Sequence, residues 1–269
     1  MDLKKTLFIF PNLLTSASLL CGVLAILRCA GPTASEQDIY RATLLVVLAF
    51  FFDLFDGRVA RMTRTQSAFG VQYDSLADLV SFGLAPAIIT YKWTLQETGI
   101  PGLVVCFVYV MGGALRLARF NVLSTAAKGP GAKPDKYMLG LPIPMAAGFI
   151  VALVVATRAM GGWPWLTEYG ITVKGISYPV MAVVMVALAL LMVSSVRFRS
   201  FKDVKLNAFT VAVLAFVVGS SVFLWWRYTP AYILIWLLVS YVTLGFGEAI
   251  VYWPRRRRDQ KGAKPPAAQ

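Results

Sequence analysis

Four aspartates stand close together in an otherwise apolar stretch between residues 51 and 78. They are Asp53, Asp56, Asp74 and Asp78, and the whole chain of 269 residues has only thirteen acidic residues. Carboxylate oxygens without histidine or cysteine partners suit hard divalent cations such as Mg²⁺ or Mn²⁺. A cluster of four carboxylates can hold two such ions, which together clamp a phosphoryl group. The sequence therefore predicts a two-metal site for phosphoryl transfer.

The remaining composition restricts the chemistry further. The chain contains no histidine, which excludes imidazole bases, Ser-His-Asp triads and phosphohistidine intermediates. Its three cysteines, Cys21, Cys29 and Cys106, show no C-x-x-C spacing and are expected to pack as small apolar side chains. Catalysis would have to depend on carboxylates, hydroxyls and bound metal.

Helix periodicity would gather the four carboxylates on two faces. At 100° per residue, one face holds Asp53, Asp56, Gly57 and Ala60, and the next helix holds Gly70, Asp74 and Asp78 in an i, i+4, i+8 stripe. A short connection separates the two helices, so we expect them to be antiparallel neighbours.

Small and basic residues accompany the acids. Gly57, Ala60 and Gly70 have almost no side chain and would leave room for a bulky ligand, while Arg61 and Arg64 could contact phosphate. The alternative is a set of buried helix–helix ion pairs. Four acids face too few buried bases for that alternative, which favours metal.

The elements that position these residues are membrane-spanning helices. Hydrophobic residues make up 58% of the chain and charged residues 14%. Uncharged runs of 18 to 22 residues, long enough to cross a bilayer, are Thr6–Leu27, Thr98–Leu115, Tyr137–Thr157, Gly175–Val196, Leu206–Trp226 and Tyr228–Gly247. Two more spans follow from Ala42–Phe52 and from Thr65–Tyr73 with Leu79–Tyr91, provided that the aspartates lie within their helices. We predict an all-α polytopic membrane protein with eight transmembrane helices.

The distribution of basic residues predicts the orientation. With eight spans, 20 of the 26 Lys and Arg residues fall on the side of the N-terminus. The positive-inside rule then places both termini, and the acidic cluster near the same face, in the cytoplasm, for a protein of the inner (cytoplasmic) membrane. We expect one membrane domain over residues 1–254 and a disordered basic tail over 255–269.

Two shorter segments complete this topology. Met1–Pro11 is expected to be an amphipathic lead-in, with Pro11 and Asn12 opening the first span. Ser124–Pro144 is rich in Gly, Pro and Lys, which predicts a long loop rather than a helix and is typical of a loop that covers a site.

The acidic stretch resembles the signature of the CDP-alcohol phosphotransferase family. That signature, D-G-x-x-A-R followed by G-x-x-x-D-x-x-x-D, is complete from Asp56 to Asp78, and Asp53 is the additional upstream acid of many members. The resemblance implies a CDP-linked lipid donor, displacement of CMP by an alcohol, and two divalent metals. It implies metal ligation by all four aspartates, with Asp78 also the base for the incoming hydroxyl. It further implies a CDP site lined by Pro11, Asn12, Thr15, Gly57, Ala60, Arg61 and Gly70.

Three longer segments are similar to the CDP-diacylglycerol–serine O-phosphatidyltransferase branch of that family. They are DSLADLVSFGLAPA, GALRLARFNV and MLGLPIPMAAG. This similarity implies CDP-diacylglycerol and L-serine as substrates and a homodimer. Serine has a carboxylate that needs a nearby cation, for which we select Arg119, beside Asn121, and then Arg116; positive-inside anchoring is the alternative role of these arginines.

Other functions are compatible with the same pattern. Within the family, the acceptor could be glycerol 3-phosphate, inositol phosphate or choline. From a different class, a cation-coupled transporter also places aspartates within the membrane.

Overall fold

The computed structural model describes residues 3–31, 34–63, 65, 67–126, 137–159, 178–195 and 197–199, and the single positions 220, 236 and 240. These residues are helical apart from their connections and one two-stranded ribbon, which confirms the all-α class. The long helices are α1 (Leu3–Ala30), α2 (Glu36–Met62), α3 (Ala68–Asp78), α5 (Ile100–Ala126), α6 (Ile143–Ala159) and α8 (Tyr178–Val193). The ribbon pairs β1 (Tyr137–Leu139) with β2 (Arg197–Arg199) in antiparallel register.

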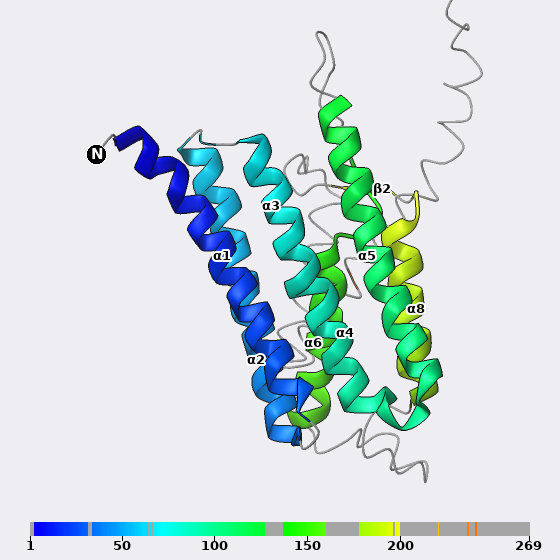
Figure 1. The fold of residues 1–269 in the computed structure, drawn as a ribbon. Helices are drawn as coiled ribbons and strands as arrows, with labels where there is room; N and C mark the ends of the chain where they lie inside the picture. Colours follow the sequence, from blue (N-terminus) through cyan, green and yellow to red (C-terminus); the bar gives the residue numbers. More distant parts are fainter. Residues whose placement is uncertain are drawn as a thin grey trace, which may run out of the picture.

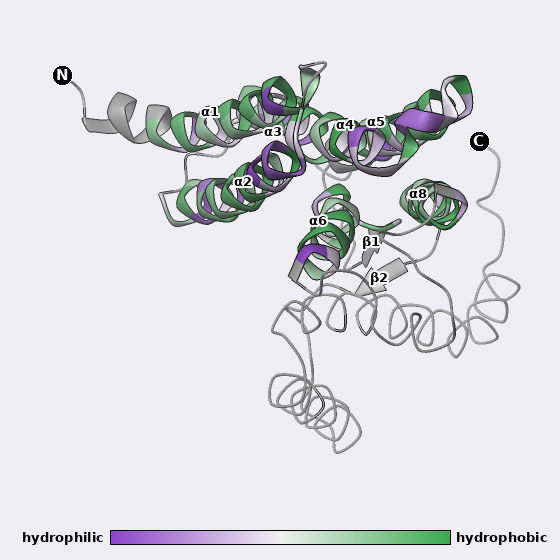
Figure 2. Ribbon diagram, turned by 90° about the horizontal axis from the view of Figure 1, so that it is seen from below, coloured by the Kyte–Doolittle hydropathy of each residue, from purple (hydrophilic) through white to green (hydrophobic). Residues whose placement is uncertain are grey.

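The long helices form a bundle in which the chain passes alternately from one end to the other (Figure 1). α1 packs along α2, α5 packs along α8, and α6 contacts both α2 and the segment that follows α3. Seen along the bundle, α6 and α8 form a second layer beside the row of α1, α3, α4 and α5 (Figure 2). The end of α2 and the start of α3 therefore lie at the same end of the bundle as the end of α5.

The helix that begins as α3 continues without a break to residue 98, although its geometry changes along the way. The π-helical segment η1 (Leu79–Leu84) follows α3, and then come α4 (Ala85–Thr90), a second π-helical segment η2 (Tyr91–Leu95) and a 3₁₀ turn η3 (Gln96–Thr98). The predicted segment Leu79–Tyr91 and most of Thr65–Tyr73 thus belong to one continuous helix, which also contains Asp74 and Asp78. Asp53 and Asp56 likewise lie inside α2, as the predicted spans required.

Two predicted boundaries at the long loop are wrong. α5 continues through the start of the predicted loop to Ala126, because its last turns carry helix-compatible residues and Asn121 bonds to α3. The predicted span Tyr137–Thr157 begins instead as strand β1, and α6 starts only at Ile143. Gly140 adopts a left-handed φ of 75° that ends the strand, and a proline on each side of Ile143 suits the first turn of a helix.

The start of the first span also differs from the prediction. α1 begins at Leu3, so Pro11 lies inside the helix rather than at its opening. A proline inside a transmembrane helix removes one backbone hydrogen bond, which other groups can compensate, so the helix can run through it.

Among the described residues, two helices qualify as membrane spans by length and composition. Phe10–Ala30 and Ile100–Leu123 are long and apolar enough to cross a membrane, and Ile143–Arg158 and Pro179–Val193 are shorter apolar helices. The last two predicted spans lie almost wholly outside the described residues. Within them the Trp236 indole N–H donates to Ser220 Oγ at 2.9 Å, a contact that joins the two runs. The predicted tail over 255–269 lies outside the described residues as well.

Candidate active site

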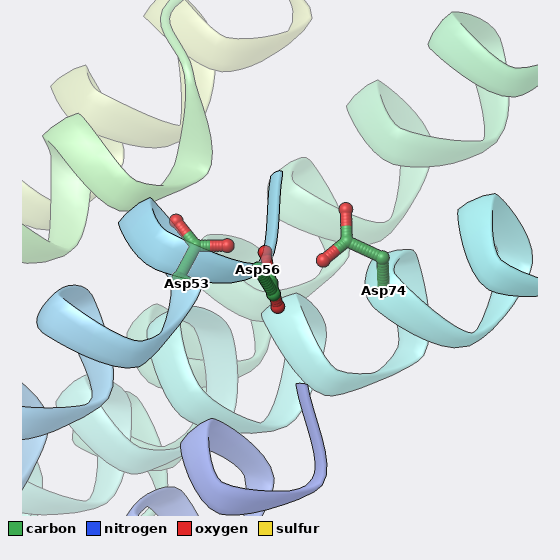
Figure 3. Close-up of side chains that lie close together, drawn as sticks. All are labelled: Asp53, Asp56 and Asp74. Atoms are coloured by element: carbon green, nitrogen blue, oxygen red, sulfur yellow. The ribbon is translucent and has the colours of Figure 1, made fainter. Parts of the chain in front are cut away.

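Three of the four aspartates lie close together, on two neighbouring helices (Figure 3). Asp53 and Asp56 come from α2 and Asp74 comes from α3, and one carboxylate oxygen of each lies within 4.8 Å of the other two. Asp56 is buried, with 5% of its surface exposed, while Asp53 and Asp74 are half-buried. The arrangement confirms that the two acidic faces converge.

A short reversal of the chain sets this geometry. α2 ends at Met62, and the Ser67 hydroxyl accepts the Gly70 backbone N–H at 2.9 Å, which caps the start of α3. α2 and α3 run in opposite directions as predicted, but both pack more extensively on α1 than on each other. α1 therefore packs on both helices that carry the acids.

Asp78 lies one turn beyond Asp74 and is outside the group of three. Its carboxylate is close enough to that of Asp53 for the two groups to interact, which connects it to the cluster. The positive charge of Arg116 on α5 is close enough to act on it. Asp78 thus lies between the acid cluster and a buried arginine.

α1 supplies the polar partner of the buried acid. Thr15 Oγ1 donates to Asp56 Oδ2 at 2.7 Å and also lies 3.1 Å from the carbonyl oxygen of Pro11. Asn12, one turn earlier, places Oδ1 3.5 Å from the point where a Cβ on Gly70 would lie. The predicted α1 positions thus contact both helices that carry the acids.

The small residues of the signature lie beside a basic side chain. A Cβ on Gly57 would lie 3.4 Å from Arg61 Nη1, so the guanidinium extends back over Gly57, and its charge acts on Asp56. Ala60 is half-buried on the same helix. At Gly70, a Cβ would lie 3.1 Å from Ser67 Oγ and would press on the cap of α3. Arg64 lies outside the described residues.

The three predicted serine-site residues on α5 point in different directions. Arg116 is buried and contacts the Phe120 ring at 5.8 Å, whereas Arg119 is exposed and donates to the Val193 carbonyl on α8 at 3.4 Å. Asn121 donates to Gln72 Oε1 and to Ser75 Oγ, each at 3.0 Å, and so joins α5 to α3. Of these residues, Arg116 is the one whose charge acts on Asp78.

The donor set suits a hard divalent cation. The three converging groups offer only carboxylate oxygens, and three negative charges within 4.8 Å need positive charge for neutrality. Asp53, Asp56 and Asp74 could hold such an ion directly, and Asp78 could join them through its contact with Asp53.

Some supporting residues were not predicted. Ser67 could have been found, because a serine directly before a helix is a typical N-cap. The hydrogen bond between Ser16 Oγ and Tyr73 Oη at 2.8 Å, which ties α1 to α3, has no counterpart in the sequence pattern. Fifty-seven residues separate these two partners, so only the packing of the helices brings them together.

Comparison with known proteins agrees with this geometry. A family model described as CDP-alcohol phosphatidyltransferase matches residues 8–183. A Helicobacter pylori (strain J99) protein is 37% identical over 218 residues, which cover 81% of this chain and 82% of that protein. A Mycobacterium tuberculosis (strain H37Rv) protein is 30% identical over 239 residues, with coverages of 86% and 74%. A Bacillus subtilis (strain 168) protein is 32% identical over 192 residues, with coverages of 71% and 90%.

All three relatives carry the name CDP-diacylglycerol–serine O-phosphatidyltransferase. The family-model match covers the acidic signature and both helices that carry it, so it spans every residue of the site described above. The chain belongs to the CDP-alcohol phosphatidyltransferase family.

Proposed function

We propose that this chain transfers the phosphatidyl group of CDP-diacylglycerol to L-serine and releases CMP. The observation that carries the proposal is the convergence of Asp53, Asp56 and Asp74 within the family signature. The names of the similar proteins support serine as the acceptor.

The acid cluster would hold the metals. Asp53, Asp56 and Asp74, with Asp78 beside Asp53, would ligate two divalent cations, Mg²⁺ or Mn²⁺. Bound there, the ions would neutralise the charge that builds up on the pyrophosphate as CMP leaves. Thr15 keeps the Asp56 carboxylate in place by donating to Oδ2.

The residues around Asp56 would bind the CDP part of the donor. Gly57, Ala60 and Gly70 have almost no side chain on the two helices that carry the acids. Arg61 presents a guanidinium over Gly57 that can pair with phosphate oxygens. On α1, Pro11, Asn12 and Thr15 would line the CDP site from the other side.

Asp78 would serve as the general base. Its carboxylate takes the proton of the serine hydroxyl as that oxygen attacks the phosphorus of the phosphatidyl group. The bond from this phosphorus to the bridging oxygen of the pyrophosphate breaks, and the electron pair leaves with CMP. A carboxylate on the acceptor side of the cluster, next to Arg116, suits this step.

Arg116 is the better candidate for the serine carboxylate. It is buried and its charge acts on Asp78, whereas Arg119 is exposed and extends toward α8. We therefore rank Arg116 before Arg119 and assign Asn121 the task of holding α5 against α3.

The placement of the protein follows the charge distribution. We propose eight transmembrane helices over residues 1–254 in the cytoplasmic membrane, with the acid cluster and both termini on the cytoplasmic side and a basic tail over 255–269. The excess of basic residues on that side supports this orientation. The homodimer rests on the family resemblance.

The test is CMP release by the purified full chain in mixed micelles of CDP-diacylglycerol with Mn²⁺ or Mg²⁺. Each candidate alcohol is added in turn, and the Asp56→Asn protein serves as a control for contaminating enzymes. We expect CMP with serine and none with glycerol 3-phosphate, inositol phosphate or choline. Release with only one of the other alcohols would overturn the serine assignment, and no release with any of them would overturn the transferase. In that last case, cation-driven uptake of a solute by vesicles that contain the protein would support the alternative of a cation-coupled transporter.

A further inference from the structure

The helix that carries Asp74 and Asp78 changes its geometry directly after Asp78. In η1 the chain widens into a π-helix, and the Ala85 N–H donates to the Val80 carbonyl five residues earlier. π-helical turns are rare in proteins, and many of those that occur lie at functional sites. The proposed base therefore stands at the junction between an α-helix and a π-helical turn.

Three consecutive residues of η1 are held by four different helices. Ser81 is fully buried, and its hydroxyl donates to the Ser18 carbonyl of α1 at 3.0 Å. Phe82 stacks on Phe50 of α2 with ring centroids 4.5 Å apart. At Gly83 a Cβ would lie 3.4 Å from Ile143 Cδ1 of α6. We call residues 81–83 the collar segment.

α5 provides the fourth contact, through Tyr109. Its side chain is fully buried, and its hydroxyl donates to the Phe82 carbonyl at 3.1 Å. In a π-helical turn the register of carbonyl bonding shifts by one residue, so a carbonyl there can accept from a side chain outside the helix. The Tyr109 hydroxyl fixes the middle residue of the collar segment from the side opposite α1.

α3 itself is anchored by its packing on α1 and by a few polar contacts. Of its eleven residues, all of which the structure describes, Ala77 alone is buried. Besides its packing on α1, polar contacts hold it, such as Ser16 with Tyr73 and Asn121 with Ser75. Because α2 and α3 pack little on each other, their mutual contact cannot set how the acids of α3 face those of α2.

We propose that Tyr109 is a positioning residue for the acid cluster, which acts by holding the collar segment and thereby the rotation of α3 that turns Asp74 and Asp78 toward Asp53 and Asp56. Tyr109 touches neither substrate nor metal in this assignment. The inference rests on the proposed function only in so far as the cluster binds a divalent metal for phosphoryl transfer.

The test replaces Tyr109 by phenylalanine, which removes one hydroxyl and keeps the ring. Groups that orient metal ligands from outside the ligand sphere typically change metal affinity or activity by about 10–100-fold. We expect the half-saturating Mn²⁺ concentration to rise about tenfold in Tyr109→Phe, both in direct Mn²⁺ binding followed by electron paramagnetic resonance and in CMP release. Excess Mn²⁺ should restore most of the turnover.

Thr90→Val is the matched control. Thr90 is also fully buried and donates its hydroxyl to a backbone carbonyl, that of Pro86 at 2.8 Å, but it lies outside the collar segment. The Thr90→Val variant should lose about as much thermal stability as Tyr109→Phe but keep the Mn²⁺ affinity of the original chain. Equal Mn²⁺ affinities of Tyr109→Phe and the original chain would overturn the inference.

A second variant covers the case in which Tyr109→Phe does not fold. Ser81→Ala removes the hydrogen bond to Ser18 from the other side of the collar segment and should raise the half-saturating Mn²⁺ concentration in the same direction. If both variants bind Mn²⁺ like the original chain while that chain releases CMP with serine, the positioning role fails and the proposed function stands. If the original chain binds Mn²⁺ more tightly than the variants but releases no CMP, the positioning role stands and the proposed function fails.

Discussion

α2 carries aspartates near both of its ends, and their partners differ. At the start of the helix, the backbone N–H and the hydroxyl of Ser35 both donate to Asp38 Oδ2, at 3.2 and 2.6 Å, and Arg28 Nη1 lies 3.7 Å from Oδ1. Near the other end, Asp53 and Asp56 face Asp74, and Thr15 donates to Asp56. Asp38 thus forms an ion pair with Arg28 as well as hydrogen bonds with Ser35.

The difference shows which carboxylates serve the fold. Asp38 lies in the first turn of α2, outside the predicted span, where the helix dipole favours negative charge. The hydrogen bonds from Ser35 hold the pKa of Asp38 below its usual value, so the folded protein favours the charged form. Asp53 and Asp56, further along α2, have other carboxylates as neighbours. Their arrangement suits the proposed metal site rather than the stability of the helix.

The strongest test of this comparison is Asp78→Asn. The amide keeps the size of the side chain but cannot take a proton from serine, and loss of a general base typically lowers turnover by about 10²–10⁴-fold. We expect kcat for CMP release to fall about a thousandfold, while binding of CDP-diacylglycerol and the melting temperature stay close to those of the original chain. Full activity would remove Asp78 as the base.

The next test compares Asp74 of the acid cluster with Asp38 at the start of α2. Asp74→Asn should abolish the rise in melting temperature that Mn²⁺ produces, since it removes one of three converging carboxylates. Asp38→Asn is the matched control, because it removes a carboxylate whose partners are all protein groups. It should keep the full Mn²⁺ effect. Equal loss of the Mn²⁺ effect in both variants would contradict the division between the acid cluster and Asp38.

A smaller effect is expected at the arginines of α5. A charge-assisted hydrogen bond to a carboxylate contributes about 1.5–3 kcal/mol, so Arg116→Gln should raise KM for serine by about 10–100-fold. Arg119→Gln should leave KM unchanged, because Arg119 extends toward Val193 on α8. Initial rates over a serine titration measure both values. The reverse pattern would assign serine to Arg119.

The sequence was sufficient for the cluster but not for its supports. Asp53, Asp56, Asp74 and Asp78 could be placed together because helix periodicity and a short connection between two helices leave few alternatives. Thr15 was linked to the nucleotide side only through the family resemblance, and the structure adds its hydrogen bond to Asp56.

What could not be predicted depends on packing between distant segments. The bond from Tyr109 to Phe82 spans 27 residues, and no periodicity marks either residue. The π-helical geometry of η1 could not be predicted either, since Leu79–Leu84 has the sequence of an ordinary, mostly apolar helix. At the long loop, Gly140 and the prolines around Ile143 were recognised as loop residues, but hydropathy alone extended the span through them.

The smallest expected effect is at the outer end of α2, in Ser35→Ala. Ser35 caps the helix, and its hydroxyl accepts the Asp38 N–H at 3.2 Å, so its loss should lower the free energy of unfolding by about 1 kcal/mol. The serine and Mn²⁺ dependence of CMP release should stay the same, because this end of α2 takes no part in the site.

The pH dependence of the stability lost in Ser35→Ala distinguishes two contributions of Ser35. One is its hydrogen bonds to the charged Asp38 carboxylate, and the other is its cap on the Asp38 backbone N–H. The pKa of Asp38 is lowered on folding, so its contribution is fully present above the unfolded value of 3.8 and disappears as the pH falls through the lower folded value. The difference in melting temperature between Ser35→Ala and the original chain should therefore be constant from neutral pH down to 3.8 and narrow only below it. A difference that already narrows near neutral pH would mean that some other titrating group holds this end of the helix. A change in the Mn²⁺ affinity of Ser35→Ala at any pH would show that the two ends of α2 are coupled. The cap at Ser35 would then help to position Asp53 and Asp56.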